Sequence, residues 1–114
     1  MTESEWLPIY YGDFWDIPNA FLTEYNGELF LFWRYFDEDL DDYALNYEVY
    51  AVKNTTLTEA FERDEEPTQG VKFRDVDLLL ENQLIGEISV KEVDFDPTKR
   101  RFVKNRIFKN LLTK

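Results

Sequence analysis

Carboxylates are the side chains of this sequence with the clearest potential for chemistry. One stretch, Asp-Glu-Asp-Leu-Asp-Asp, holds five acids in six residues. Its Asp37, Asp39 and Asp41, together with Glu48, fall at positions 1, 3, 5 and 12 of a calcium-loop pattern, in which carboxylates surround a hard cation. Position 6 is Asp42, where the sharp turn needs glycine, and the flanking segments read as strands. A weak calcium-binding module is therefore an alternative, and a solvated acidic hairpin tip is the favoured interpretation.

Most catalytic chemistry is excluded by what the chain lacks. It has no Cys and no His, which removes thiol nucleophiles, thiol redox chemistry, zinc sites and His-based acid–base catalysis. Ser4 and Ser89 have no His base, and the four glycines are too widely separated to form a phosphate-binding loop. Acid pairs such as Glu24 and Glu28 could in principle serve a glycosidase, but with 24 acids some pair always looks suitable. We therefore expect no enzyme, no cofactor and no metal.

Charge is sorted along the chain. The first 96 residues contain all 24 acids and 6 of the 13 basic residues, a net charge of −18, and the last 18 residues carry +7 without an acid. A body this acidic repels nucleic acid and anionic membranes and attracts basic proteins. The basic tail reads more readily as a final strand or helix that neutralises acidic neighbours than as a nucleic-acid-binding strip.

The acidic stretch needs a sheet to position it. Asn26-Gly27 lies between two β-prone runs, which is the strongest local signal for a hairpin because both turn positions need positive φ. The run from Glu28 to Phe36 is apolar on both faces, which is typical of a central strand. With a strand at Tyr43–Val52, these segments predict an antiparallel meander over residues 20–52. Arg34 interrupts one apolar face, and we expect it to pair with Glu24 or Glu48 on a neighbouring strand.

Helices are predicted after the meander. Thr56 and Glu59 fit a capping box, so a short helix is expected over residues 56–62. Apolar residues at spacings of three and four predict a longer helix over 71–84, with Gly86 as its C-cap. Residues 87–95 fit either a strand or a helical turn, and with a returning strand at 102–108 they favour a C-terminal hairpin. The expected class is α+β, a small antiparallel sheet with one longer and one short helix, in a single domain over residues 1–114.

The order of these features resembles a family of small bacterial domains of unknown function. The matching stretches are Ile9–Asp13, Asn26–Phe32, Asp37–Asp42, Tyr47–Val52 and Leu84–Ser89, the last reading Leu-Ile-Gly-Glu-Ile-Ser. The stretch 54–70 and the basic tail depart from the family pattern. The resemblance implies an α+β domain and supplies no activity.

The function we expect is binding of a basic protein partner. One version is an inhibitor of the kind phages or mobile elements encode, which imitates the charge of nucleic acid, and the partner would then be a nucleic-acid-binding protein. The alternative is an accessory or immunity-type protein without mimicry. The carboxylates expected to bind the partner are Asp37, Glu38, Asp39, Asp41, Asp42, Glu62, Asp64, Glu65 and Glu66. No direct contact with nucleic acid or membrane is expected.

The cytoplasm is the expected compartment. The N-terminal sequence Met-Thr-Glu-Ser-Glu-Trp lacks the basic and apolar regions of a signal peptide. No apolar run approaches the ~20 residues that a membrane-spanning helix needs. The absence of Cys fits a reducing environment.

Overall fold

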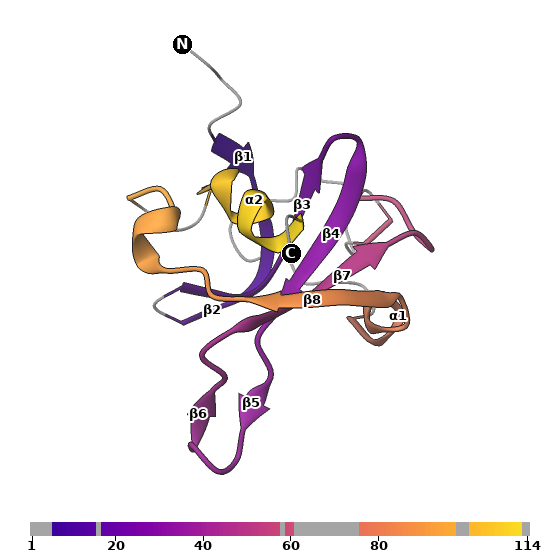
Figure 1. The fold of residues 1–114 in the computed structure, drawn as a ribbon. Coiled ribbons are helices and arrows are strands. Elements are labelled where there is room, and N and C mark those ends of the chain that lie inside the picture. The colour runs from indigo at the N-terminus through magenta and orange to yellow at the C-terminus, as the bar shows by residue number, and fades with distance from the viewer. Residues whose placement is uncertain (1–5, 16, 58, 61–75, 98–100, 113–114) are drawn as a thin grey trace.

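Strands dominate the part of the chain that the structure describes. The computed structural model describes residues 6–15, 17–57, 59–60, 76–97 and 101–112 (Figure 1). The elements in order are β1 Trp6–Pro8, β2 Tyr10–Trp15, β3 Ile17–Tyr25, β4 Glu28–Trp33, β5 Phe36–Asp37, β6 Asp42–Tyr43, β7 Tyr47–Val52, α1 Val76–Leu80, β8 Gln83–Ile88, a 3₁₀-helix Glu92–Asp94, β9 Phe102–Lys104 and α2 Arg106–Leu112.

A five-stranded antiparallel sheet forms the centre of the fold, in the order β2-β3-β4-β7-β8. The predicted hairpin is present: Tyr25 pairs with Glu28 across Asn26 and Gly27, whose φ angles are 53° and 81°. β4 is the middle strand, as its two apolar faces predict. The meander of residues 20–52 therefore forms the core of the sheet, although a separate two-stranded ribbon, β5–β6, interrupts it between β4 and β7.

Both faces of this sheet carry a buried cluster. Neighbouring residues of a strand point to opposite sides, so one strand can contribute side chains to both clusters. On β3 and β4, Phe21 and Phe32 belong to one buried cluster, and Leu22 and Leu31 belong to the other. Helix α2 packs into the first cluster through its residues Ile107, Phe108 and Leu111. Helix α1 packs into the second cluster through Leu79.

The first cluster is rich in aromatic rings. The rings of Phe21 and Phe32 stack with centroids 4.7 Å apart, and the ring of Phe108 lies edge-on to Phe32 at 5.5 Å. Phe108 also stacks on Tyr25, with centroids 4.3 Å apart. Helix α2 comes close to the sheet at Gly86 of β8, where an added Cβ would lie 2.9 Å from Leu111 Cδ1. A strand glycine here leaves room for the helix.

The expected α+β class with a longer helix over 71–84 is wrong, because the described part of the chain is sheet-rich and the two α-helices in it are short. Residues 71–75 lie outside the described part; α1 has five residues, and β8 begins at Gln83. Asn82 ends the helix: its side-chain NH₂ donates to the carbonyl of Leu79 at 2.9 Å, and its oxygen accepts from the backbone N–H of Lys53 at 2.8 Å. The apolar spacing ran past this point through Leu84, which lies in β8 and is 51% exposed.

The expected helix over 56–62 is also not found in its described residues. The capping-box bonds do form: the Thr56 N–H donates to the Glu59 carboxylate at 3.2 Å, and the Glu59 N–H donates to the Thr56 hydroxyl at 3.3 Å. The described residues here form only a turn, closed by the Ala60 N–H on the Thr56 carbonyl at 3.0 Å, and residues 58, 61 and 62 lie outside the described part.

The expected C-terminal hairpin is replaced by a different arrangement. Its first half contains the end of β8 and the 3₁₀-helix, and Phe95 makes a single bridge to Val103. The strand β9 instead pairs antiparallel with β1, and the chain then turns into α2. Phe108, expected at the end of a strand, lies on this helix because helical spacing brings it and Leu111 onto the same face.

Candidate protein-binding finger

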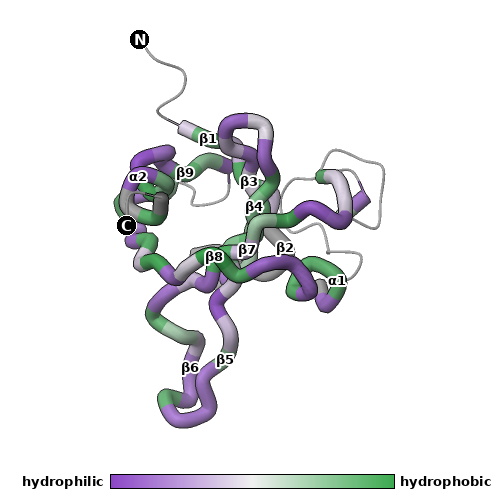
Figure 2. The backbone as a smooth tube through the Cα atoms, turned by 45° about the vertical axis from the view of Figure 1, so that its right-hand side comes forward, coloured by the Kyte–Doolittle hydropathy of each residue, from purple (hydrophilic) through white to green (hydrophobic). Residues whose placement is uncertain are grey.

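The acidic stretch forms a projecting ribbon, which we call the finger (residues 35–45). It links the end of β4 to the start of β7 and contains β5 and β6. In both views it extends from the sheet on the side opposite β1 and α2 (Figures 1 and 2). Figure 2 shows it mostly in the hydrophilic colour, with a short hydrophobic stretch at its end. The finger is therefore an isolated acidic projection on the molecule.

Two aspartates shape the finger through bonds to the backbone. Asp37 Oδ1 accepts the N–H of Asp39 at 2.9 Å, as a short polar side chain does in an Asx turn. Asp42 Oδ1 accepts the N–H of Tyr43 at 2.7 Å. Asp41 has φ 54°, a left-handed conformation that Asp tolerates better than most residues. The carboxylates of Asp37 and Asp42 therefore bind the backbone of the finger, which leaves them fewer free oxygen atoms for a partner.

The remaining acids of the finger are turned to solvent. Glu38, Asp39 and Asp41 are exposed, and no hydrogen bond or ion pair to a described residue neutralises their carboxylates. The structure therefore brings the first five predicted partner-binding residues together on one ribbon. The other four, Glu62, Asp64, Glu65 and Glu66, lie outside the described residues.

Large apolar side chains share the finger with these acids. Phe36 is 51% exposed, Leu40 54% and Leu45 80%. Phe36 contacts Tyr43 edge-on across the ribbon, with ring centroids 5.5 Å apart. Apolar surface next to charge, on a segment that projects from the core, is typical of a protein-binding surface. Sequence reasoning missed it because Phe36 and Leu45 were assigned to the apolar faces of buried strands.

Arg34 fixes the base of the finger. Its NH2 group donates a hydrogen bond to the side-chain oxygen of Asn19, and its guanidinium lies 5.6 Å from the ring centroids of both Tyr43 and Tyr47. The expected ion pairs are wrong, because these contacts replace them. Arg34 Nε is buried and has no hydrogen-bond partner among the described residues, so the guanidinium is held by its bond to Asn19 and by packing on the two tyrosine rings.

Two tyrosines of β7, Tyr47 and Tyr50, have raised pKa values. Burial raises the pKa of Tyr47 well above its usual value of about 10, and the positive charge of Arg34 opposes this shift. Burial also raises the pKa of Tyr50 to about 12, helped by its hydrogen bond to Glu48 at 2.9 Å and by that carboxylate's charge. Both hydroxyls therefore stay protonated at neutral pH and act as packed structural groups.

Other candidate chemistry finds little support in the described part of the chain. Within it, no group of three or more acidic side chains is arranged to hold a metal ion. Glu48, the last position of the calcium pattern, lies in β7 and accepts the Tyr50 hydroxyl. No helix among the described residues is long and apolar enough to cross a membrane.

The basic tail has a structural contact in the described region. Arg106 Nε donates to Asp94 Oδ1 at 2.8 Å, and the second oxygen of Asp94 accepts the N–H of Lys91 at 3.0 Å. Asp96 Oδ1 accepts the N–H groups of Arg101 and Phe102, both at 3.0 Å. These buried carboxylates organise the segment that leads into α2.

Comparison with known proteins gives no relative on which to base a function. No protein-family model, no curated protein and no solved structure matches the chain. The resemblance to small bacterial domains of unknown function therefore stays a prediction, and the finger is the feature of the chain that bears on its function.

Proposed function

We propose that this protein binds a basic protein partner through the finger, in the cytoplasm and without enzymatic activity of its own. The observation that carries the proposal is the combination of exposed carboxylates with exposed Phe36, Leu40 and Leu45 on one projecting ribbon. The net charge of −11 speeds association with a positively charged surface. The apolar side chains then supply the area whose burial gives a complex its lifetime.

The finger favours ordinary complementarity over pure imitation of nucleic acid. A phosphate backbone offers charge without apolar side chains, whereas the centres of protein interfaces are depleted in charge and enriched in aromatic residues. Phe36 would contribute such a residue. Imitation of nucleic-acid charge remains the second candidate, supported by the exposed acids Glu38, Asp39 and Asp41.

The test compares two variants with equal charge change in a pull-down from host lysate. The first neutralises the finger, with Glu38→Gln, Asp39→Asn and Asp41→Asn. It leaves the two aspartates that bind the backbone, and Asn tolerates the left-handed conformation at position 41. The control neutralises three exposed acids elsewhere, Asp77, Glu81 and Glu87. Both variants lose three negative charges, so net charge alone cannot distinguish them.

We expect the finger variant to bind the captured partner about three- to 150-fold more weakly, from about 0.2–1 kcal/mol for each partly screened contact. The control should bind almost as wild type does. Replacing Phe36 and Leu40 by Ser should weaken binding further, at high salt as well as low salt, because apolar contacts are not screened. Equal losses in the finger variant and in the control would contradict the assignment to the finger.

Added double-stranded DNA separates the two versions. If the finger imitates nucleic acid, DNA competes for the same basic groove and releases the partner. If the contact is ordinary complementarity, the partner stays bound in the presence of DNA, and the Ser variant of the apolar residues is the one that fails to capture it.

A further inference from the structure

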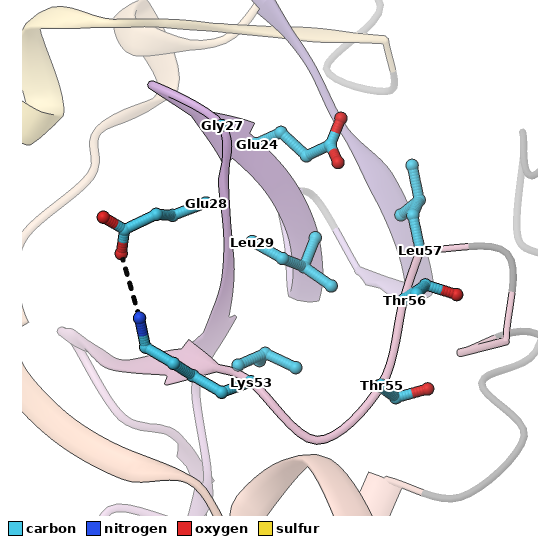
Figure 3. Close-up of a pocket in the computed structure, with 9 residues that line it drawn as sticks. Glu24, Gly27, Glu28, Leu29, Lys53, Thr55, Thr56 and Leu57 are labelled. Atoms are coloured by element: carbon cyan, nitrogen blue, oxygen red, sulfur yellow. Dashed lines mark hydrogen bonds and ion pairs between the residues drawn. The ribbon is translucent and has the colours of Figure 1, made fainter.

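A second site lies at the other end of β4 from the finger. A pocket of about 320 Å³ is open between the β3–β4 hairpin and residues 52–57 (Figure 3). Its volume is at the lower end of the range for small-molecule sites, which is about 300–1,000 Å³. The pocket shares no residue with the finger, so it requires its own explanation.

The floor of this pocket is apolar. Leu29 and Val52 are buried members of the second core cluster, and half-buried Leu57 packs against the same cluster. In Figure 3 the Leu29 side chain lies in the middle of the pocket. An aliphatic chain of a few carbon atoms would be removed from water on this floor.

The rim of the pocket carries one uncompensated negative charge. Lys53 Nζ lies 3.5 Å from Glu28 Oε1, so these two groups form an ion pair and their charges cancel. Glu24 is exposed, and no hydrogen bond or ion pair joins its carboxylate to a described residue. Figure 3 shows Glu24 beside Leu57, on the far side of Leu29 from the Glu28–Lys53 pair. A ligand that crosses the floor would therefore meet a carboxylate at one end.

We propose that the pocket binds a cationic alkyl group, that is, an ammonium or guanidinium on an aliphatic stem. The stem would lie on Leu29, Val52 and Leu57, and the charged head would contact Glu24. Long basic side chains divide between apolar and polar surroundings in this way. An anionic ligand is disfavoured by Glu24 and by the acidic charge of the surrounding chain. This site is independent of the finger and goes beyond the proposed function.

The test is a titration of the folded protein with n-butylammonium chloride, followed by backbone amide NMR. We expect saturable shifts at Leu29, Val52 and Leu57. Neutral n-butanol has the same stem without the charge and should bind about two- to fivefold more weakly. Glu24→Gln should remove this preference for the cation. The matched control, Glu38→Gln on the finger, has the same net charge and should retain it.

Three results would overturn the proposal: no saturable shift, equal affinity for the amine and the alcohol, or an unchanged preference in Glu24→Gln. Because Glu24 is exposed and its carboxylate makes no hydrogen bond or ion pair to a described residue, its replacement should leave the fold intact, which the unchanged spectrum of the remaining amides verifies. A titration with N-acetyl-lysine N-methylamide then identifies the source of the cation. Tighter binding than n-butylammonium indicates a lysine side chain of a polypeptide, and equal binding indicates a free amine.

Discussion

Truncation of Phe108 tests how helix α2 is joined to the sheet. The Phe108 side chain is fully buried, at 0% exposure, and its ring contacts Tyr25, Phe30 and Phe32 at centroid distances of 4.3, 5.0 and 5.5 Å. Phe→Ala changes at such sites cost about 3–5 kcal/mol, because the lost apolar burial and the cavity left behind add together. A domain of this size has about 5–15 kcal/mol of stability in total, so Phe108→Ala should remove a large part of it.

Urea unfolding followed by tryptophan fluorescence measures this loss. Val93→Ala is the control, because Val93 is 66% exposed and its truncation should change the free energy of unfolding by no more than about 0.5 kcal/mol. A double-mutant cycle with Tyr25→Ala should give a coupling of about 0.5–1.5 kcal/mol for the stacked pair. A loss below about 1 kcal/mol for Phe108→Ala, with an unchanged dependence on urea, would refute the packing of α2. If Phe108→Ala does not fold, Phe108→Leu should still lose about 1 kcal/mol.

Three further predictions concern the base of the finger and the approach of α2. Arg34→Met should cost about 1–3 kcal/mol and speed hydrogen exchange at the Ala44 N–H, which donates to the Tyr35 carbonyl across the base of the finger. Unchanged exchange at Ala44 would show that Arg34 does not hold this base. Burial raises the pKa of Tyr47, so the hydroxyl loses its proton at a lower pH in the unfolded chain than in the folded protein. The free energy of unfolding should therefore be unaffected below pH ~9 and fall by up to about 1.4 kcal/mol per pH unit above pH ~10. Tyr47→Phe should reduce this loss of stability with pH, measured by urea unfolding at alkaline pH. An unchanged dependence of stability on pH would contradict the raised pKa of Tyr47. Gly86→Ala should cost about 1–3 kcal/mol, and less in a Leu111→Val background, whereas equal losses in both would exclude the close contact.

The sheet was the most predictable part of the fold, because its signals are local. Asn26-Gly27 sets the turn within two residues, and the two-faced pattern of β4 reports its central position directly. The helix over 71–84 could not be judged from periodicity alone. Its apolar spacing continues through Asn82 into β8, and only the pairing of β8 with β7 and the bonds from Asn82 to residues 53, 54 and 79 show where the helix stops.

The candidate site was predictable in its charge and not in its shape. Five of the expected carboxylates lie together because they are adjacent in sequence. The exposure of Phe36 and Leu45 could not be predicted from the sequence. Apolar and polar residues alternate in the same way in a core strand and in a ribbon that leaves the sheet. The partners of Arg34 depend on three separate segments, and the pocket combines β3, β4 and residues 52–57, so neither has a signature in a single stretch of sequence.

The pairing of β1 with β9 has a consequence for the order of folding. Trp6 and Lys104 are register partners, although they stand 98 positions apart in the chain. Closing so long a loop has a high entropic cost, and contacts of large sequence separation slow folding. The β3–β4 hairpin needs only a two-residue turn and can form early. We therefore expect β1 and β9 to join late, after the central sheet, and a growing chain on the ribosome would hold β1 unpaired until residue 104 has emerged from the exit tunnel.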